Sequence, residues 1–148
     1  MVTTYTKYFD RIMNLILVDC SIQLPNSQEE NPEQLSALWD TGANITCIST
    51  RLAEKLKLES FDEAMLSVAN NEIFRAKTYY VQLNMGEFSI PFIKVLGLPM
   101  DKSKDIIIGM DVISKGDLSI TNYAGKTVLS FREPSMGTVD YSKGVVEL

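Results

Sequence analysis

The sequence predicts an all-β domain, a closed barrel or sandwich of short strands with one or two short helices. Three observations support this prediction. Apolar residues alternate with polar ones, or form short runs, over most of the chain, which is typical of strands. Turn-forming Pro, Gly and Asn residues separate these segments at short intervals. One segment has the spacing of an amphipathic helix, and a second has that of a helical turn. The 148 residues fit one domain.

The amino-acid composition argues against two classes of binding partner, nucleic acids and membranes. The net charge of −5, with no basic patch, argues against a nucleic-acid-binding protein. The longest purely apolar run, residues 15–18, is too short to span a membrane. The first residues include Asp10 and Arg11 and lack the long apolar stretch of a secretory signal. We therefore expect a cytoplasmic protein without a membrane or nucleic acid as its partner.

The N-terminal part predicts an arm, a strand and a long loop. Residues 1–11 have no clear period and form either a flexible arm or an edge segment. Apolar and polar residues then alternate up to Leu24, which indicates a half-buried strand over 12–24, and Pro25 ends it. Residues 26–34 contain almost no apolar side chain, so they predict a loop before the apolar run at 35–39.

A short strand and a helix follow. Residues 45–48 are strand-like, and either Ser49 or Thr50 can cap a helix after them. The helix has its apolar residues on one face, at Leu52, Ala53 and Leu56. Two alternating segments, 65–69 and 73–83, then flank Asn70 and Asn71. Because Asn tolerates positive φ, these two residues predict the tip of a hairpin.

The last third predicts more strands and one helical turn. A strand at 88–95 contains Pro91, which indicates an edge or a bulge. Residues 106–108 are apolar enough to be buried on both faces of a sheet, and a helical turn at 110–115 follows, with Gly116 as its stop. Residues 118–121 and 127–131 predict a final hairpin. The domain thus spans 12–132, and residues 133–148 are either a disordered tail or a strand that joins a dimer.

The chain has no histidine, which excludes several kinds of site. Hydrolases that rely on a Ser-His or Cys-His pair from this chain alone are ruled out. Two cysteines are too few for an all-thiolate zinc site, and there is no Gly-rich phosphate loop. Cys20 and Cys47 both fall in strand-like stretches and are expected to be buried free thiols, although a disulfide between them stays open. We expect no metal or cofactor, and carboxylates are the natural acid–base groups.

One carboxylate occupies a special position. Asp40, Thr41 and Gly42 stand in succession between two apolar strand-like runs. A lone acid there must sit at a tight turn or be buried, and burial requires a partner or a raised pKa. Gly42 permits a sharp turn and close approach to a ligand, and Thr41 can fix that turn by a local hydrogen bond. The simpler alternative is a strand–turn–strand corner with an incidental Asp.

A second motif favours a functional interpretation of Asp40–Gly42 over an incidental turn. Residues 105–113 read Asp-Ile-Ile-Ile-Gly-Met-Asp-Val-Ile, a buried strand that ends at a glycine before a short helix. The pair, in this order, resembles the aspartic proteases of the retropepsin type. The first motif resembles their D-[TS]-G-A catalytic loop, and the second resembles their hydrophobic-hydrophobic-glycine segment. Residues 39–58 look like the single-domain bacterial and retroelement members of the family.

The resemblance implies how a site would be assembled. The chain has one D-T-G and about half the length of a two-lobed enzyme, so the resemblance implies a homodimer with Asp40 of each subunit as the catalytic acid–base. Thr41 would bond its counterpart across the dimer. A second set of residues would contact a polypeptide substrate: Gly42, Ala43 and Asn44 of the loop, Ile108 and Gly109 at the pocket wall, and Ala69, Asn70 and Asn71 in a flap.

The sequence departs from the family in one respect. Viral members often carry Asp after the Ala of the loop and Arg after the Gly of the second motif, and these form a supporting ion pair. Here the positions hold Asn44 and Met110. Asp111 is a candidate for the same task, by capping the short helix. Trp39, beside the acid, is expected to be a core aromatic rather than a substrate contact.

The sequence therefore predicts a retropepsin-like aspartic endopeptidase that activates water with an Asp dyad. The alternative is a non-catalytic dimerisation or peptide-binding module on the same fold. A third possibility is a piece of a larger polyprotein, such as a retroelement product. The intact Asp-Thr-Gly favours the enzyme, and the missing ion pair favours the binding module.

Overall fold

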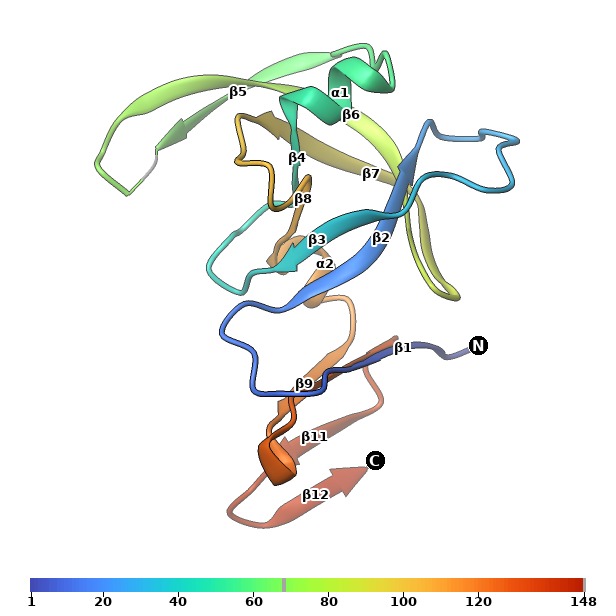
Figure 1. The fold of residues 1–148 in the computed structure, drawn as a ribbon, viewed down its shortest axis with the longest axis vertical. Helices are drawn as coiled ribbons and strands as arrows, with labels where there is room; N and C mark the ends of the chain where they lie inside the picture. Colours follow the sequence, from blue (N-terminus) through green and yellow to red (C-terminus); the bar gives the residue numbers. More distant parts are fainter. Residues whose placement is uncertain (68, 148) are drawn as a thin grey trace.

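The computed structural model describes residues 1–67 and 69–147, and its body is a closed barrel (Figure 1). The barrel strands are joined in the order β2 (Leu17–Gln23), β3 (Leu35–Trp39), β8 (Ile106–Ile108), β4 (Cys47–Ser49), β7 (Phe88–Leu98) and β6 (Ile73–Met85). Pairing of β6 with β2 closes the ring. The predicted all-β closed architecture is confirmed, and no helix in the described part is long and apolar enough to cross a bilayer.

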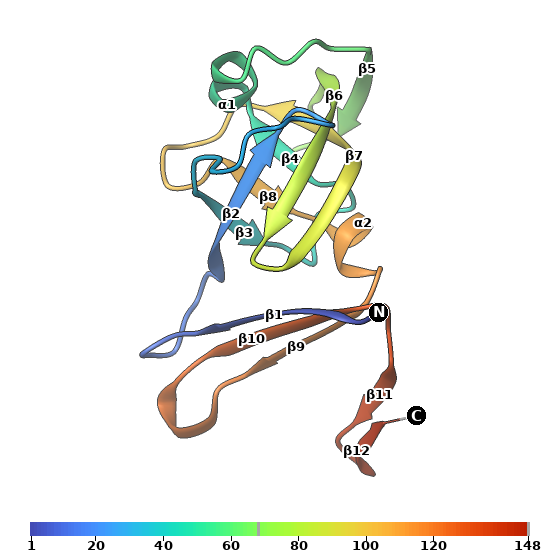
Figure 2. The ribbon, with the colours of Figure 1, turned by 90° about the vertical axis from the view of Figure 1, so that its right-hand side faces the viewer.

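A three-stranded sheet lies beneath the barrel (Figure 2). Its strands are β1 (Thr3–Tyr8), β10 (Val128–Glu133) and β9 (Asp117–Thr121), with a 3₁₀ turn, η1 (Tyr123–Gly125), between β9 and β10. The N-terminal residues thus form an edge strand, the second of the two alternatives for this segment. The C-terminal residues form a hairpin, β11 (Gly137–Asp140) and β12 (Gly144–Glu147), that lies apart from this sheet.

Helix α1 (Thr50–Lys55) is capped by Ser49, one of the two residues that the sequence offered for this role. The Ser49 hydroxyl accepts a hydrogen bond from the Leu52 amide at 3.1 Å, which satisfies one of the free amides of the first turn. The helix ends at Leu56, and the next residue, Lys57, adopts a left-handed φ of 53°. Glycine is the usual residue at this position because a Cβ is strained there.

Replacing Lys57 by Gly is expected to stabilise the fold by about 0.5–1 kcal/mol. The gain from relieving the left-handed strain exceeds the entropy that glycine adds to the unfolded chain. Urea unfolding of Lys57→Gly against the native chain measures the difference. A substitution at Lys55, which has ordinary helical geometry, serves as the control: Lys55→Gly should destabilise instead.

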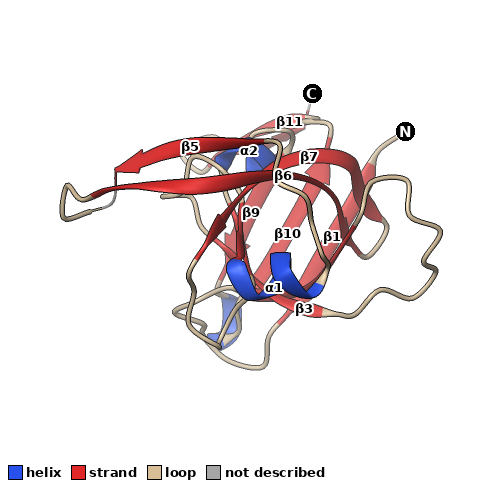
Figure 3. Cartoon of the chain, turned by 90° about the horizontal axis from the view of Figure 1, so that it is seen from above, coloured by secondary structure: helices blue, strands red, loops and turns tan. Residues whose placement is uncertain are grey.

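The hairpin of β5 (Asp62–Ser67) and β6 has the predicted tip. Asn71 has a φ of 62°, and the Asn70 side chain accepts a hydrogen bond from the Glu72 amide at 3.1 Å. Val68, which the sequence placed in this strand, lies outside the described residues. The hairpin extends well beyond the barrel (Figure 3). Pro91 lies where the β6–β7 register shifts between Val81 and Leu83, as a bulge requires.

The main core fills the barrel and the space between the barrel and the three-stranded sheet. Trp39 is buried there and packs against Phe131 with ring centroids 5.3 Å apart, so its prediction as a core aromatic is confirmed. A second apolar cluster lies between the β5–β6 hairpin and strands β4, β7 and β8, next to the acid loop of residues 40–46; its buried members are Cys47, Ala76 and Leu96. Cys20 and Cys47 are both buried and free.

Gly116 is needed for a different reason from the predicted one. Helix α2 spans only Met110–Ile113 and is capped by Ser114. A Cβ on Gly116 would collide with the backbone carbonyl of Arg132 on β10. The glycine therefore permits close contact between the chain leaving α2 and the three-stranded sheet.

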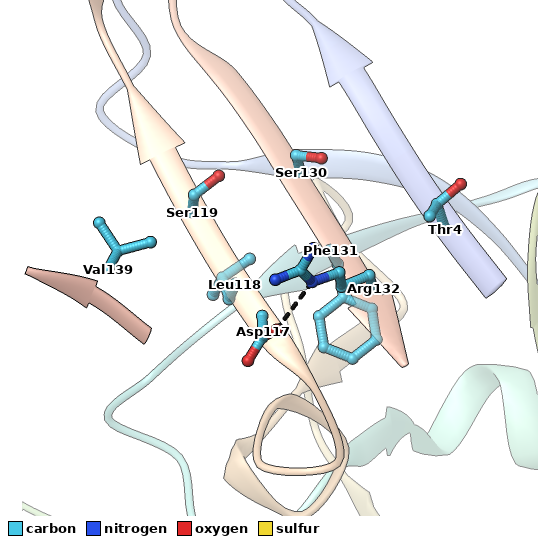
Figure 4. Close-up of a pocket in the computed structure, with 8 residues that line it drawn as sticks. All are labelled: Thr4, Asp117, Leu118, Ser119, Ser130, Phe131, Arg132 and Val139. Carbon is cyan, nitrogen blue, oxygen red and sulfur yellow. Dashed lines mark hydrogen bonds and ion pairs between the residues drawn. The ribbon is translucent and has the colours of Figure 1, made fainter. Parts of the chain in front are cut away.

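A pocket of about 330 Å³ lies between this sheet and the C-terminal hairpin (Figure 4). It lies away from the acid loop, and one of its polar residues fixes the root of the hairpin. The Asp117 carboxylate accepts hydrogen bonds from the Ser135 hydroxyl, from the Met136 amide at 2.7 Å and from Arg132 Nε at 2.8 Å. These bonds hold the pKa of the Asp117 carboxyl well below its usual range.

Asp117→Asn is expected to lower the Tm at pH 7. Since the pKa of Asp117 is lowered by folding, its stabilisation is complete above the usual pKa of Asp, about 4, and is lost as the pH falls below that value. The gap in Tm between the two proteins should therefore shrink steadily as the pH is taken below about 4. Calorimetry across this range measures it, and a gap independent of pH would contradict the assigned role of the charge.

Candidate active site

The acid loop, residues 40–46, joins β3 to β4. Asp40 is the first residue after β3, and its amide donates to the Ile108 carbonyl of β8 at 2.9 Å. Its Oδ1 accepts from the Gly42 amide at 2.9 Å, and the Ala43 amide donates to the Asp40 carbonyl at 3.2 Å. Within the described residues Oδ2 accepts no hydrogen bond. Asp40 therefore stands at a tight turn, half-exposed, with one carboxylate oxygen held and the other open.

The second motif, residues 105–113, holds the acid loop through backbone hydrogen bonds. The Met110 amide donates to the Ala43 carbonyl at 2.8 Å, and the Asp111 amide donates to the Asn44 carbonyl at 3.2 Å. A Cβ on Gly109 would come within 2.8 Å of the Ile45 carbonyl carbon and 2.9 Å of the Ala43 oxygen. Only glycine lets the two backbones approach this closely.

The Asp111 side chain forms a second tie between the motifs. Both of its carboxylate oxygens accept from the Thr46 amide at 3.0 Å, and Oδ1 accepts from the Thr46 hydroxyl at 2.7 Å. The Thr46 hydroxyl in turn accepts from the Gly109 amide at 3.1 Å. The cap of α2 is Gly109, not Asp111, so the predicted helix cap is wrong. Asp111 instead binds the end of the acid loop directly.

The two positions of the viral ion pair are neutral here. Asn44 is exposed, and Met110 is half-buried against the main core. In the part of the chain that the structure describes, no ion pair joins the acid loop to α2. The Asp111–Thr46 bonds within one chain provide the connection.

Ile107 and Ile108 face opposite sides of β8. Ile108 is fully buried in the main core beneath the loop, so its side chain offers no surface to a ligand. Ile107 is half-buried and packs against the second apolar cluster, together with Ile45 and Leu66. The strand is thus not buried equally on both faces, and Ile107 is the β8 residue that packs with the second apolar cluster.

The predicted site residues fall into two groups. Asp40, Thr41, Gly42, Ala43, Asn44, Ile108 and Gly109 meet around the acid loop. Ala69, Asn70 and Asn71 are exposed at the tip of the β5–β6 hairpin. The tip and the acid loop project to the same side of the barrel (Figure 1). The second apolar cluster runs between them, because it contains Ala64 and Leu66 of the hairpin and Ile45 of the loop.

Sequence reasoning missed Ile45, Leu66 and Ile107, whose side chains in the second apolar cluster form an apolar wall between the acid loop and the hairpin. The signal available for Ile107 was strand alternation, which places it on the face opposite to Ile106 and Ile108. Burial raises the pKa of the neighbouring Cys47 thiol to about 11, and the Asp111 and Asp40 carboxylates add to this shift. Among the described residues no group of His, Cys, Asp or Glu side chains is arranged to hold a metal ion.

Comparison with known proteins agrees with these motifs. The family described as "gag-polyprotein putative aspartyl protease" matches residues 29–115. No curated protein sequence matches the chain. A retropepsin-like aspartic protease from Rickettsia conorii has a similar structure, with a TM-score of 0.55, 12% identity and coverage of 89% of this chain and 95% of its own. EIAV protease in complex with the inhibitor HBY-793 gives a TM-score of 0.53, 17% identity and coverage of 68% and 86%.

The structural matches establish the fold, and the family match spans both the acid loop and the segment that supports it. The chain therefore belongs to the gag-polyprotein aspartyl protease family and has a retropepsin-like fold.

Proposed function

We propose that the chain is an aspartic endopeptidase whose dyad forms across a homodimer, with one Asp40 from each subunit. The observation that carries this proposal is the state of the Asp40 carboxylate. It is fixed through Oδ1 by the Gly42 amide and is half-exposed at the start of a loop whose backbone carbonyls accept hydrogen bonds from the first residues of α2. An Asp that only formed a strand–turn–strand corner would not require these hydrogen bonds between its loop and α2.

The chemistry needs two carboxylates. One must be ionised to take a proton from water, and the other must be protonated to donate to the peptide carbonyl. Two acids about 3 Å apart cannot both be ionised, so the dyad shares a proton and titrates as a unit. A single chain supplies one Asp-Thr-Gly, and a two-fold axis beside Asp40 would supply the second.

The remaining residues take roles around this dyad. Thr41 would bond across the axis, Gly42 would accept the substrate backbone, and Ala43 and Asn44 would line the adjacent subsites. Gly109 and Ile108 would support the loop, and Ile107 would take the place of Ile108 as the wall that contacts substrate. The hairpin tip at 69–72 would close over the peptide and exclude water. The wall favours apolar substrate side chains beside the scissile bond.

The test combines mass with cleavage. The purified chain is run in an analytical ultracentrifuge with and without a statine-type transition-state mimic, and is incubated with a peptide library. A dimer, or a monomer that the mimic drives to a dimer, together with cleavage at apolar pairs, is the expected result. A strict monomer that ignores the mimic and cleaves nothing would overturn the proposal and favour the binding-module alternative.

A further inference from the structure

Leu15 is an exposed apolar residue that belongs neither to the acid loop nor to the second motif, residues 105–113. The ladder between β2 and β3 pairs Leu17 with Leu38, and the Trp39 amide donates to the Ile16 carbonyl at 3.0 Å. Continued past the first residue of β2, over the bend at Leu15, this antiparallel register would set Leu15 opposite Asp40. Leu15 is 58% exposed, although its neighbour Ile16 is buried.

The segments that border Asp40 also lack charge. They are residues 12–17 before β2 and at its start, 41–45 in the acid loop and 107–110 at the end of β8. None of these positions holds Asp, Glu, Lys or Arg, whereas charged residues make up 22% of the chain. These segments, which end at Arg11 and Asp111, thus carry no charge, and among their apolar side chains Leu15 is the most exposed and Met110 is half-buried.

A neutral surface suits a second copy of this chain. Each copy carries a net charge of −5, so two copies repel one another at long range. Near a two-fold axis each residue lies close to its own symmetry mate, so any charge there would face the same charge. A surface without charge avoids this repulsion, and burying Leu15 would contribute apolar contact.

We infer that the two subunits associate beside the dyad through an apolar contact centred on Leu15, with Met110 at its edge, rather than through ion pairs. This inference rests on the proposed function, because it places the axis beside Asp40. It goes further in naming the residue and the chemistry of the contact. An apolar contact predicts that salt leaves the dimer intact, since screening weakens ion pairs and also reduces the repulsion between the two negative copies.

The experiment compares matched variants by sedimentation equilibrium. Leu15→Asp places like charges near the axis and should weaken the dimer at least about tenfold. Leu24→Asp is the control, because Leu24 is 49% exposed and follows the opposite end of β2. It should leave the dimer unchanged. Leu15→Met should also preserve it, and circular dichroism with Tm checks that every variant is folded.

Salt provides the second measurement. Raising NaCl from about 0.1 M to about 1 M shortens the Debye length from about 10 Å to about 3 Å. The dissociation constant of the native dimer should stay the same or fall. Marked weakening by salt, or a Leu15→Asp variant that dimerises and cleaves as the native chain does, would overturn the inference while leaving the proposed dyad standing. A chain that stays monomeric with the transition-state mimic would overturn both.

Discussion

Asp40→Asn is expected to abolish peptide cleavage while the chain stays folded and dimeric. The amide keeps the shape of the carboxylate, and its oxygen can still accept from the Gly42 amide. It can neither take a proton from water nor share one with its symmetry mate. Loss of acid–base catalysis predicts a fall in kcat/KM of at least about 10²–10⁴-fold. Steady-state kinetics on a cleaved peptide, with Tm measured on the same samples, tests this result.

The matched control is Asp19→Asn. Asp19 is exposed in the middle of β2 and pairs with Ser36 of the same β3 strand that leads to Asp40. Its substitution removes one negative charge from the same sheet without touching the acid loop. Activity should stay close to the native value. If Asp40→Asn kept native activity, Asp40 would not be the acid and the enzyme proposal would fail.

Asp111→Ala is expected to have the largest effect on stability among changes near the site. It leaves the buried Thr46 amide and the Thr46 hydroxyl without their acceptor, whereas the Val112 amide keeps the Gly109 carbonyl at 3.1 Å. Buried donors that lose their partner cost about 1–3 kcal/mol each, so we expect a loss of about 2–4 kcal/mol. Because Thr46 ends the acid loop, kcat should also fall. Urea unfolding and kinetics measure the two effects.

Thr46→Val tests whether these residues act together. It removes the hydroxyl that donates to Asp111 and accepts from the Gly109 amide, and it keeps the side-chain volume. The losses from Asp111→Ala and Thr46→Val should be non-additive by at least about 0.5 kcal/mol in a double-mutant cycle. Additive losses would mean that Asp111 does not act through Thr46. Asp10→Ala, in an exposed loop, is the surface control and should be nearly neutral.

Much of the fold and of the site could be predicted because it depends on residues that are neighbours in the sequence. The turn at Asp40–Gly42, the Ser49 cap and the hairpin tip at Asn71 each depend on residues that are neighbours in sequence. Strand alternation and turn residues then indicated short strands throughout. The count of short strands, with one helix and a helical turn, indicated an all-β domain but left a closed barrel and a sandwich both open, because the sequence specifies no strand pairing.

Contacts between distant residues were beyond sequence reasoning. Asp111 resembles a helix cap locally, but it bonds Thr46 across a tertiary contact, which no local pattern shows. Gly116 resembles a helix stop, but the carbonyl of Arg132 is what requires it. A run of three isoleucines does not show which of them face the main core; the structure places Ile106 and Ile108 there and leaves Ile107 half-buried against the second apolar cluster.

The two ends of the chain were also not predictable. Residues 3–8 pair with β10, at the other end of the sequence, and the partner of such a strand cannot be read from its own alternation. The C-terminal hairpin depends on the turn held by Asp117 and on the pairing of β11 with β12. Leu148, which the sequence included in this segment, lies outside the described residues.

Subunit mixing tests the central claim most directly. Native chain and Asp40→Asn chain are unfolded together in equal amounts, refolded, and assayed at a total concentration well above that at which the dimer forms. If each active site takes one Asp40 from each of two copies, random pairing leaves about a quarter of the native activity, because only native homodimers have both acids. About half of the native activity would mean that each chain works alone, and would contradict the shared dyad.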